Sequence, residues 1–435
     1  KGAVDKVVDD YRKGINGRYL LFGITGSGKT EVYMEIMEEV ISQGKQVIFL
    51  IPEIALSFQM VERLSARFGE RISIMNSRMS QGERYDQYLR AKHGDIDIIV
   101  GPRSALFTPF NNLGLIIVDE EHEGSYKSSK TPRYHAREVA LYRAKDEGAA
   151  IILGSATPSL EAVKLASDKE IEVLMLLSRP AGAILPEIEV TDLREELKEG
   201  NKSIISRRLS ELIKDRLNKG EQIILFINRR GYAGFISCRS CGEAIKCPHC
   251  DVSLTFHRPD RLVCHYCGYE EKMPDKCPKC ASPYIGTFGL GTEKVEEIVK
   301  KDFPTARVLR MDGDTTTGKN GHEAILESFK NGEADILIGT QMIVKGHDFE
   351  KVSLVGILAA DLSLFLGDFR AAETTYELLV QAAGRAGRGR YRGKAVIQTY
   401  NPDHYVIQAA ATGNYKDFYS KEIRYRRLGE YPPET

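Results

Sequence analysis

Eight cysteines confined to one short stretch constrain the fold of this chain more than any other feature. They form four Cys-x-x-Cys pairs between Cys238 and Cys280, and the other 392 of the 435 residues contain none. A two-residue spacing lets both thiolates of a pair reach one tetrahedral Zn²⁺ ion, so four pairs make two four-cysteine sites. Disulfides are the alternative, but they are rare in a reducing cytosol. The predicted zinc ligands are Cys238, Cys241, Cys247, Cys250, Cys264, Cys267, Cys277 and Cys280.

The order of the pairs also predicts which of them share an ion. Thirteen residues separate Cys250 from Cys264, which is a comfortable length for a hairpin. We therefore expect the second and third pairs to make an inner site, and the first and fourth pairs to close around it as an outer site. Sequential pairing, in which the first pair joins the second and the third joins the fourth, stays open at this point.

Length and composition place the chain among ordinary globular proteins. A chain of 435 residues with 42% hydrophobic and 28% charged residues accommodates two to four domains, each with its own core. No apolar run approaches the roughly 20 residues of a membrane span. No signal peptide precedes the first motif, so we expect a cytoplasmic protein without a membrane partner. The 61 basic and 61 acidic residues balance, which excludes a chain-wide basic surface but not local patches.

Two series of apolar runs predict an α/β fold with two domains. These runs alternate with helix-length segments, a pattern typical of parallel sheets covered on both faces. The expected strands are 19–22, 46–51, 96–100, 113–119 and 149–154 in the first series, and 222–226, 306–310, 334–339, 352–358 and 394–400 in the second. The expected domains are a first lobe (1–180), a connector (181–203), a second lobe (204–227 and 285–410), a zinc insert (228–284) and the start of a truncated C-terminal region (411–435).

The segment GITGSGKT (23–30) follows a predicted strand and opens a predicted helix, which is the context of a phosphate-binding loop. Its glycines let backbone N–H groups turn toward phosphate oxygens, and the positive end of the helix dipole adds to the attraction. We expect Lys29 to bridge the β- and γ-phosphates of ATP and Thr30 to bind Mg²⁺. The predicted nucleotide-binding residues are Gly23, Ile24, Thr25, Gly26, Ser27, Gly28, Lys29, Thr30 and Asp119.

The segment LIIVDEEH (115–122) ends a predicted strand with carboxylates. Asp119 is placed to hold the Mg²⁺ ion, and Glu120 to orient or deprotonate the attacking water. A solvated acidic strand end is the plainer interpretation, and the phosphate-binding loop in the same sheet argues against it. In GSATPS (154–159), the small hydroxyl residues sense the γ-phosphate, cap the helix that starts at Ser159, or do both.

In the second half, QAAGRAGRGR (381–390) carries the remaining predicted catalytic residues. Gln381 and Arg385 lie four residues apart, on one face of a predicted helix, with Arg388 near its end. Arginines in this arrangement can neutralise charge on the departing γ-phosphate, so we expect one active site built from two lobes that open and close with nucleotide state. The alternative is a basic helix terminus whose charges complement the helix dipole. This alternative explains the later arginines, Arg390 and Arg392, better than it explains Arg385 and Arg388.

Taken in chain order, these segments resemble the motif series of superfamily-2 helicases, which also includes IPEIALS (51–57), GPRSALF (101–107) and GTQMIVKGHDF (339–349). The cysteine block, with PRYHARE (132–138) and FINRRGYAGF (226–235), sharpens the resemblance to the primosomal protein N′ (PriA) family of bacterial replication-restart helicases. Nearly the whole chain takes part. The N-terminal DNA-binding region and the C-terminal domain of that family have no counterpart in these residues.

The resemblance implies two RecA-like parallel-sheet lobes with a two-zinc insert in the second lobe. It implies a monomeric ATP-dependent helicase that moves 3′→5′ on single-stranded DNA, remodels stalled forks at the nucleoid and starts primosome assembly. ATP, Mg²⁺ and two Zn²⁺ would be its cofactors, and forked DNA, single-strand-binding protein and helicase-loading proteins its partners. An RNA helicase, a duplex-DNA translocase with a zinc-stabilised docking module and a non-catalytic assembly platform are the competing interpretations. The intact catalytic residues argue against the platform.

Helicase lobes of this type hold single strands chiefly through phosphates, with aromatic stacking as a supplement. The loop EGSYKSSKTPRYH (123–135) interleaves aromatic and basic residues directly after the predicted catalytic carboxylates. We expect this coupling loop to link DNA occupancy to hydrolysis, and a mobile polar surface loop is the alternative. The predicted DNA-coupling residues are Arg103, Ser104, Tyr126, Lys127, Arg133, Tyr134, His135 and Lys345.

Charge argues against the zinc insert as an electrostatic clamp on DNA. Residues 229–280 hold nine Lys/Arg and six Asp/Glu, and eight thiolates with two Zn²⁺ bring the net charge to about −1. The metal ions replace a core that roughly 40 residues cannot build. Aromatic side chains expected on the surface favour a strand-separating wedge or a protein-docking face; they are Tyr232, Phe235, Phe256 and Tyr266.

Overall fold

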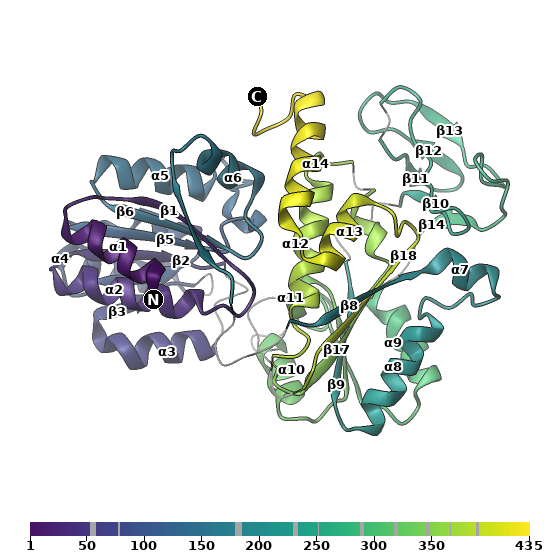
Figure 1. Cartoon of the computed structure of the whole chain (residues 1–435), viewed down its shortest axis with the longest axis horizontal. Coiled ribbons are helices and arrows are strands. Elements are labelled where there is room, and N and C mark those ends of the chain that lie inside the picture. Colours follow the sequence, from purple (N-terminus) through teal and green to yellow (C-terminus); the bar gives the residue numbers. More distant parts are fainter. Residues whose placement is uncertain are drawn as a thin grey trace. The chain divides into compact units, whose positions relative to one another are not determined.

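The computed structural model consists of two compact units, Lys1–Gly182 and Ala183–Thr435 (Figure 1). It describes residues 1–52, 58–76, 79–178, 185–228, 234–250, 252–287, 291–316, 321–344, 349–365, 367–388 and 391–435. Each unit contains one large parallel sheet with helices packed on it, so the predicted α/β class with two parallel-sheet lobes is confirmed. Among the described helices, none is long and apolar enough to cross a membrane.

The first unit is an open sheet covered on both faces. Its elements are α1 (Gly2–Arg12), β1 (Arg18–Gly23), α2 (Lys29–Ser42), β2 (Gln46–Leu50), α3 (Phe58–Phe68), η2 (Gly69–Arg71), β3 (Ile72–Ile74), α4 (Gln81–His93), β4 (Ile98–Gly101), η3 (Arg103–Phe107), β5 (Leu113–Asp119), η4 (Gly124–Tyr126), α5 (Ala136–Asp146), β6 (Ala150–Ser155), α6 (Leu160–Ser167) and β7 (Glu172–Leu176). All strands run parallel, in the order β3-β4-β2-β5-β6-β1-β7.

Successive residues of the central strands enter two different hydrophobic cores. In β2, Val47 and Phe49 pack into one core, and Ile48 and Leu50 into the other. Helices α1, α2 and α3 contribute to the first core, and α4, α5 and α6 to the second. This double burial is the reason why these strands are continuous apolar runs in the sequence.

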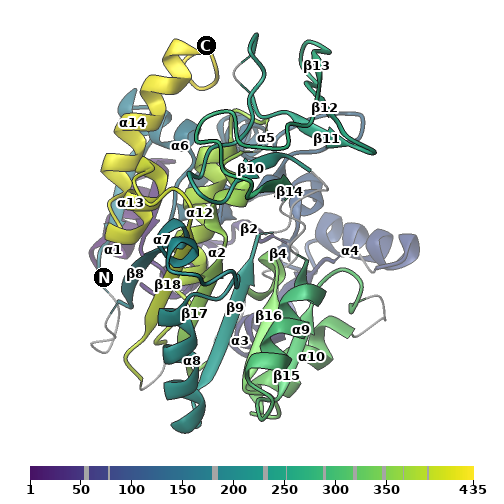
Figure 2. The same ribbon diagram turned by 90° about the vertical axis from the view of Figure 1, so that its right-hand side faces the viewer.

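The second unit contains the other parallel sheet and the zinc insert. Its elements are β8 (Glu187–Asp192), α7 (Leu193–Lys198), α8 (Arg207–Asn218), β9 (Gln222–Ile227), β10 (Ile236–Cys238), β11 (Thr255–His257), β12 (Arg261–Val263), β13 (Glu270–Lys272), β14 (Ile285–Thr287), α9 (Thr292–Asp302), β15 (Val308–Met311), α10 (Gly321–Lys330), β16 (Ile336–Gly339), α11 (Gln341–Val344), β17 (Val352–Leu358), η6 (Ala360–Ser363), α12 (Ala371–Ala383), β18 (Lys394–Thr399), α13 (Tyr405–Thr412) and α14 (Tyr415–Leu428). The large sheet has the order β15-β16-β9-β17-β18-β8, and its strands lie side by side in Figure 2.

The zinc insert leaves the large sheet after β9 and returns before α9. Its two ends are joined where β10 pairs with β14 in antiparallel fashion, and β11, β12 and β13 form a separate antiparallel sheet. Its core is small and centres on Ile245, Leu254 and Leu262, with two of the cysteines. So small a core makes metal binding a main source of stability.

The ten predicted strands are all present, with bounds within two residues of those expected. In the two large sheets, three further strands, β3, β7 and β8, are not predicted from the sequence. The prediction of a plain connector over 181–203 is wrong, since β8 and α7 lie in it and β8 pairs with β18. Strand β8 is a half-buried edge strand of sequence EIEVTD, so it lacks the apolar run that marks the central strands.

Candidate nucleotide site and zinc centres

The predicted phosphate-binding loop turns between β1 and α2. Gly26 and Gly28 adopt φ values of +80° and +88°, a left-handed backbone conformation that side chains with a Cβ rarely occupy. Lys29 is the first residue of α2, and its Nζ donates to the backbone O of Gly23 at 2.9 Å. The lysine thus reaches back across the loop, next to the backbone N–H groups that precede the helix. Such an arrangement suits a polyphosphate.

Asp119, the last residue of β5, is held by two tyrosines. Tyr33 of α2 donates its hydroxyl to Oδ1 at 2.9 Å, and Tyr126 donates to the backbone O at 2.8 Å. Gly154 on β6 makes room for this contact, because a Cβ there would lie 1.6 Å from the Tyr33 hydroxyl oxygen. Burial raises the pKa of Asp119 to about 6; the charge of Glu120 adds to the rise and the Tyr33 hydroxyl opposes it. Tyr33 is not among the residues predicted for this site.

Glu120 is placed differently from its buried neighbour. Its φ of +45° lies in the left-handed region, which costs a non-glycine residue about 1–3 kcal/mol, and 29% of its side chain is exposed. His122 links this segment to GSATPS, since its Nδ1 lies 2.7 Å from Ser155 Oγ and 3.6 Å from the Glu120 carboxylate. The first two carboxylates of DEEH therefore differ, since Asp119 is buried and anchored whereas the side chain of Glu120 is partly exposed.

The third residue of DEEH, Glu121, was not predicted to matter and is fully buried. Its carboxylate accepts hydrogen bonds from the backbone N–H and the hydroxyl of Ser159 at 2.7 and 2.9 Å, and from Arg137 at 2.9 Å. Ser159 also caps α6 by accepting from Ala162 N–H, so the capping interpretation of GSATPS is confirmed for this residue. A buried acid with all of these donors joins β5, α5 and α6 rigidly.

The coupling loop (123–135) is tied to the GPRSALF segment. Arg103 donates from Nη1 to the backbone O atoms of Ser125 and Lys127, at 2.9 and 2.7 Å. The rings of Phe107 and Tyr134 meet edge-on with centroids 5.4 Å apart. These contacts join two segments that lie about twenty residues apart in the sequence.

The individual coupling residues differ in accessibility. Lys127, Arg133 and Ser104 are exposed, and Tyr134 is half-buried. Tyr126 is only 1% exposed, so the interpretation of this tyrosine as a stacking surface is wrong, because its ring packs into the core under Asp119. His135 caps α5 by accepting from Arg137 N–H, a structural position that its sequence context does not indicate.

In the second unit, the predicted catalytic residues lie at and beyond the end of α12. Gln381 is a buried helical residue, but the helix ends at Ala383, so the prediction that it shares a helical face with Arg385 is wrong. Arg385 donates from Nε to Val344 O at 2.6 Å, and Arg388 donates to Gly384 O at 3.1 Å. Lys345, Tyr232 and most of IPEIALS lie outside the described residues.

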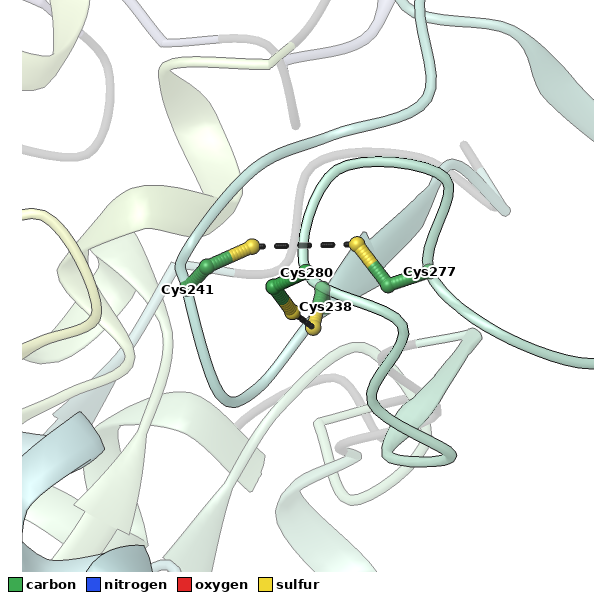
Figure 3. A group of neighbouring side chains, drawn as sticks. All are labelled: Cys238, Cys241, Cys277 and Cys280. Carbon is green, nitrogen blue, oxygen red and sulfur yellow. Dashed lines mark hydrogen bonds between the residues drawn. The ribbon is translucent and has the colours of Figure 1, made fainter.

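The eight cysteines form two clusters, and within each cluster the sulfur atoms lie within 4.8 Å of one another. The outer cluster joins the first and fourth pairs, with Cys238 and Cys280 sulfurs 3.6 Å apart and Cys241 and Cys277 sulfurs 3.7 Å apart (Figure 3). The inner cluster joins the second and third pairs. The nested pairing is thus confirmed. Four sulfurs about 2.3 Å from a tetrahedral Zn²⁺ would be about 3.8 Å apart, so the thiolates fit the ion.

The aromatic residues of the zinc insert are less exposed than predicted. Tyr266 is 61% exposed, whereas Phe235 is only 5% exposed and contacts Phe365 with ring centroids 5.3 Å apart. Phe256 is half-buried on β11. The expectation of a surface aromatic at 235 is therefore wrong, because this ring packs against Phe365, which lies outside the insert.

Family models match three parts of the chain in order. The model described as DEAD/DEAH box helicase matches residues 12–166. The PriA DNA helicase Cys-rich region (CRR) domain matches residues 247–272, and the helicase conserved C-terminal domain matches residues 286–390. The matches follow the two units and the inner cysteine cluster described above.

Curated proteins named replication restart protein PriA are similar to this chain. The one from Bacillus subtilis is 51% identical over 416 residues, covering 95% of this chain and 52% of the relative. The one from Synechocystis is 47% identical over 424 residues, covering 95% and 51%. The chain thus spans about half the length of these relatives. The solved structure of RecG bound to a three-way DNA junction has the same fold, with a TM-score of 0.57 and 17% identity over 99% of this chain and 47% of that one.

Proposed function

Because the chain belongs to the PriA family of replication restart proteins, we propose that it is the motor core of an ATP-dependent DNA helicase. The observation that carries this proposal is the pair of hydrogen bonds to Asp119. One comes from the helix of the phosphate-binding loop and the other from the coupling loop. Such a connection can pass a change at the bound nucleotide to the segment that we expect to contact DNA.

In this mechanism, the backbone N–H groups of the phosphate-binding loop and Lys29 bind the β- and γ-phosphates. Thr30 and Asp119 would hold Mg²⁺, an ion that neutralises phosphate charge when bound. Glu120, whose side chain is 29% exposed, orients the attacking water and accepts its proton. We propose that Arg385 and Arg388 neutralise the negative charge that develops on the departing γ-phosphate.

We further propose movement 3′→5′ along single-stranded DNA, remodelling of stalled forks in the bacterial cytoplasm, and initiation of primosome assembly. Single-strand-binding protein and helicase-loading proteins are the proposed partners. Family membership supports this part of the proposal. Zinc supplies structural cross-links when bound to the two cysteine clusters, and the eight thiolates then fix the insert as one rigid piece.

One assay separates the candidate functions. ATP hydrolysis is measured with single-stranded DNA, RNA or duplex DNA, followed by unwinding of a forked DNA substrate. A DNA helicase is stimulated by single-stranded DNA and separates the fork. Stimulation of ATP hydrolysis by RNA alone would indicate an RNA helicase. Stimulation by duplex DNA without strand separation would indicate a duplex-DNA translocase. The absence of ATP hydrolysis would indicate a non-catalytic assembly platform.

Tyr33→Phe is expected to weaken the use of Mg²⁺. A hydrogen bond to a charged group contributes about 1.5–3 kcal/mol, so the Mg²⁺ concentration for half-maximal ATP hydrolysis should rise on the order of 10-fold. The Tyr33 hydroxyl lowers the pKa of Asp119, so its removal raises that pKa further. ATP hydrolysis by Tyr33→Phe, relative to wild type, should therefore fall more at pH 6.5 than at pH 8. At the higher pH fewer protons compete with Mg²⁺ for the Asp119 carboxylate.

Tyr19→Phe is the matched control, since this buried tyrosine of the same unit donates to Asp10, outside the site. Equal Mg²⁺ requirements in Tyr33→Phe and wild type would contradict the role given to Tyr33.

Replacing Arg133 and Tyr134 by Ala tests the coupling loop. Arg133 is exposed, and Tyr134 holds the loop against Phe107. We expect basal ATP hydrolysis to persist and its stimulation by single-stranded DNA to fall several-fold, since base–aromatic stacking contributes about 1–3 kcal/mol per base. ATP turnover with and without DNA measures this, and Tyr142→Ala, an exposed tyrosine on α5, is the control. If single-stranded DNA still stimulates ATP hydrolysis by the double variant as it does in wild type, the segment is a polar surface loop with no coupling role.

A further inference from the structure

The outer zinc site rests directly on the carboxyl end of β18. Arg239, between Cys238 and Cys241, donates to the Tyr400 hydroxyl and to Lys202 O, both at 3.0 Å. Asn401 donates from Nδ2 to Gly242 O at 3.0 Å. A Cβ at Gly242 would lie 2.3 Å from Tyr400 O, so the backbones of the two segments are in close contact.

This contact is anchored by Asp361, a buried carboxylate just after β17. It accepts from the Thr399 hydroxyl at 2.6 Å and from Tyr400 N–H at 2.7 Å, and Asn401 Nδ2 lies 3.4 Å away. Asp361 is 4% exposed and lies in η6. The ends of β17 and β18 are thereby fixed to each other directly beneath the outer zinc site.

The inner zinc site touches the same region. Tyr266, between Cys264 and Cys267, is largely exposed, yet its hydroxyl donates to Gly367 O at 2.7 Å. Phe235, ahead of the first cysteine pair, packs on Phe365. The described part of the β17–α12 segment (359–370) therefore contacts the insert beside both zinc sites.

The other end of the β17–α12 segment is fixed to the last helices. Phe369 stacks on Tyr431 with ring centroids 4.9 Å apart, and the guanidinium of Arg426 lies 4.8 Å from the Phe369 ring. Arg426, itself fully buried, donates to Glu373 in the first turn of α12 at 2.9 Å. Helix α12 then runs to Ala383, two residues before Arg385.

We propose that the β17–α12 segment is the link through which the motor positions the zinc insert, with Tyr266 and Asn401 as positioning residues. The inference rests on the proposed function. A displacement of α12 during ATP hydrolysis then moves the insert as one body with the sheet, instead of leaving it tethered by β10 and β14 alone. The insert would thus convert nucleotide state into separation of the strands.

Tyr266→Phe and Asn401→Ala, made singly and together in the complete protein, test the link. The three measurements are zinc content, DNA-stimulated ATP hydrolysis and base pairs of forked DNA unwound per ATP. We expect two zinc ions per chain and hydrolysis near the wild-type rate. Unwinding per ATP should fall about two- to ten-fold for each lost hydrogen bond. Tyr269→Phe is the control, because this hydroxyl bonds Glu271 within the insert.

Wild-type unwinding per ATP in the double variant would overturn the link. Hydrogen exchange of the backbone amides over 359–370 tests it without unwinding, since both variants should exchange faster there and Tyr269→Phe should not. If wild-type protein hydrolyses ATP but separates no strands, the proposed function fails while the exchange result still decides the link. Unchanged exchange would overturn the link whatever the unwinding assay shows.

Discussion

Lys29→Ala should abolish ATP hydrolysis and, with it, unwinding. Lys29 reaches over the phosphate-binding loop to Gly23 O, which holds its positive charge where we expect the γ-phosphate to bind. Removing one preorganised group of this kind lowers turnover about 10²–10³-fold. DNA binding should persist, because the predicted DNA-coupling residues lie on other segments. Steady-state hydrolysis and single-stranded DNA binding, measured on the same preparation, check both statements.

Lys45→Ala is the matched control for this change. Lys45 is a partly exposed lysine of the same unit that donates to Asn112, and its loss should leave turnover unchanged. Hydrolysis by the Lys29→Ala variant at the rate of the Lys45→Ala control would remove the basis of the proposed motor.

Cys264→Ser should release one of two zinc ions and unfold most of the zinc insert. Structural zinc binding contributes about 10–16 kcal/mol at neutral pH, whereas the insert core holds few apolar side chains. We expect the outer cluster to keep its ion, since β10 and β14 still join the ends of the insert. Hydrolysis should survive better than fork unwinding. Metal analysis, thermal denaturation and the two activity assays measure these effects.

Ser282→Ala serves as the control, since this serine bonds Ser240 beside the outer cluster and binds no metal. It should retain two zinc ions and normal unwinding. Fork unwinding at the wild-type rate by Cys264→Ser would mean that the insert plays no part in strand separation.

Features that depend on local backbone geometry could be predicted from the sequence. Gly26 and Gly28 mark a loop whose backbone turns left-handed, and the apolar runs mark strands that are buried on both faces. Loop length favoured the nested zinc pairing over the sequential one, and the structure confirms it. In each case the information lies within a few dozen consecutive residues, so no tertiary contact was needed to find it.

Features that depend on the direction of a side chain could not be predicted. An aromatic residue in a polar loop gives no sign of whether it faces solvent, and Tyr126 instead packs inward beneath Asp119. In the sequence, Tyr33 looks like an ordinary core residue of α2. Only the structure shows that Gly154 leaves room for its hydroxyl to reach the Asp119 carboxylate. Glu121 and Arg137 reveal their pairing only when β5 and α5 are packed together.

Strand β8 has a consequence for the solubility of the second unit. It covers β18 along its whole length, from Lys394 to Thr399. An uncovered strand edge is a template on which another chain can add a strand, and this begins many kinds of aggregation. The segment of the second unit that precedes α8 therefore also guards a sheet edge. A fragment begun at residue 204 would lose this guard, whereas one begun before Glu187 would keep it.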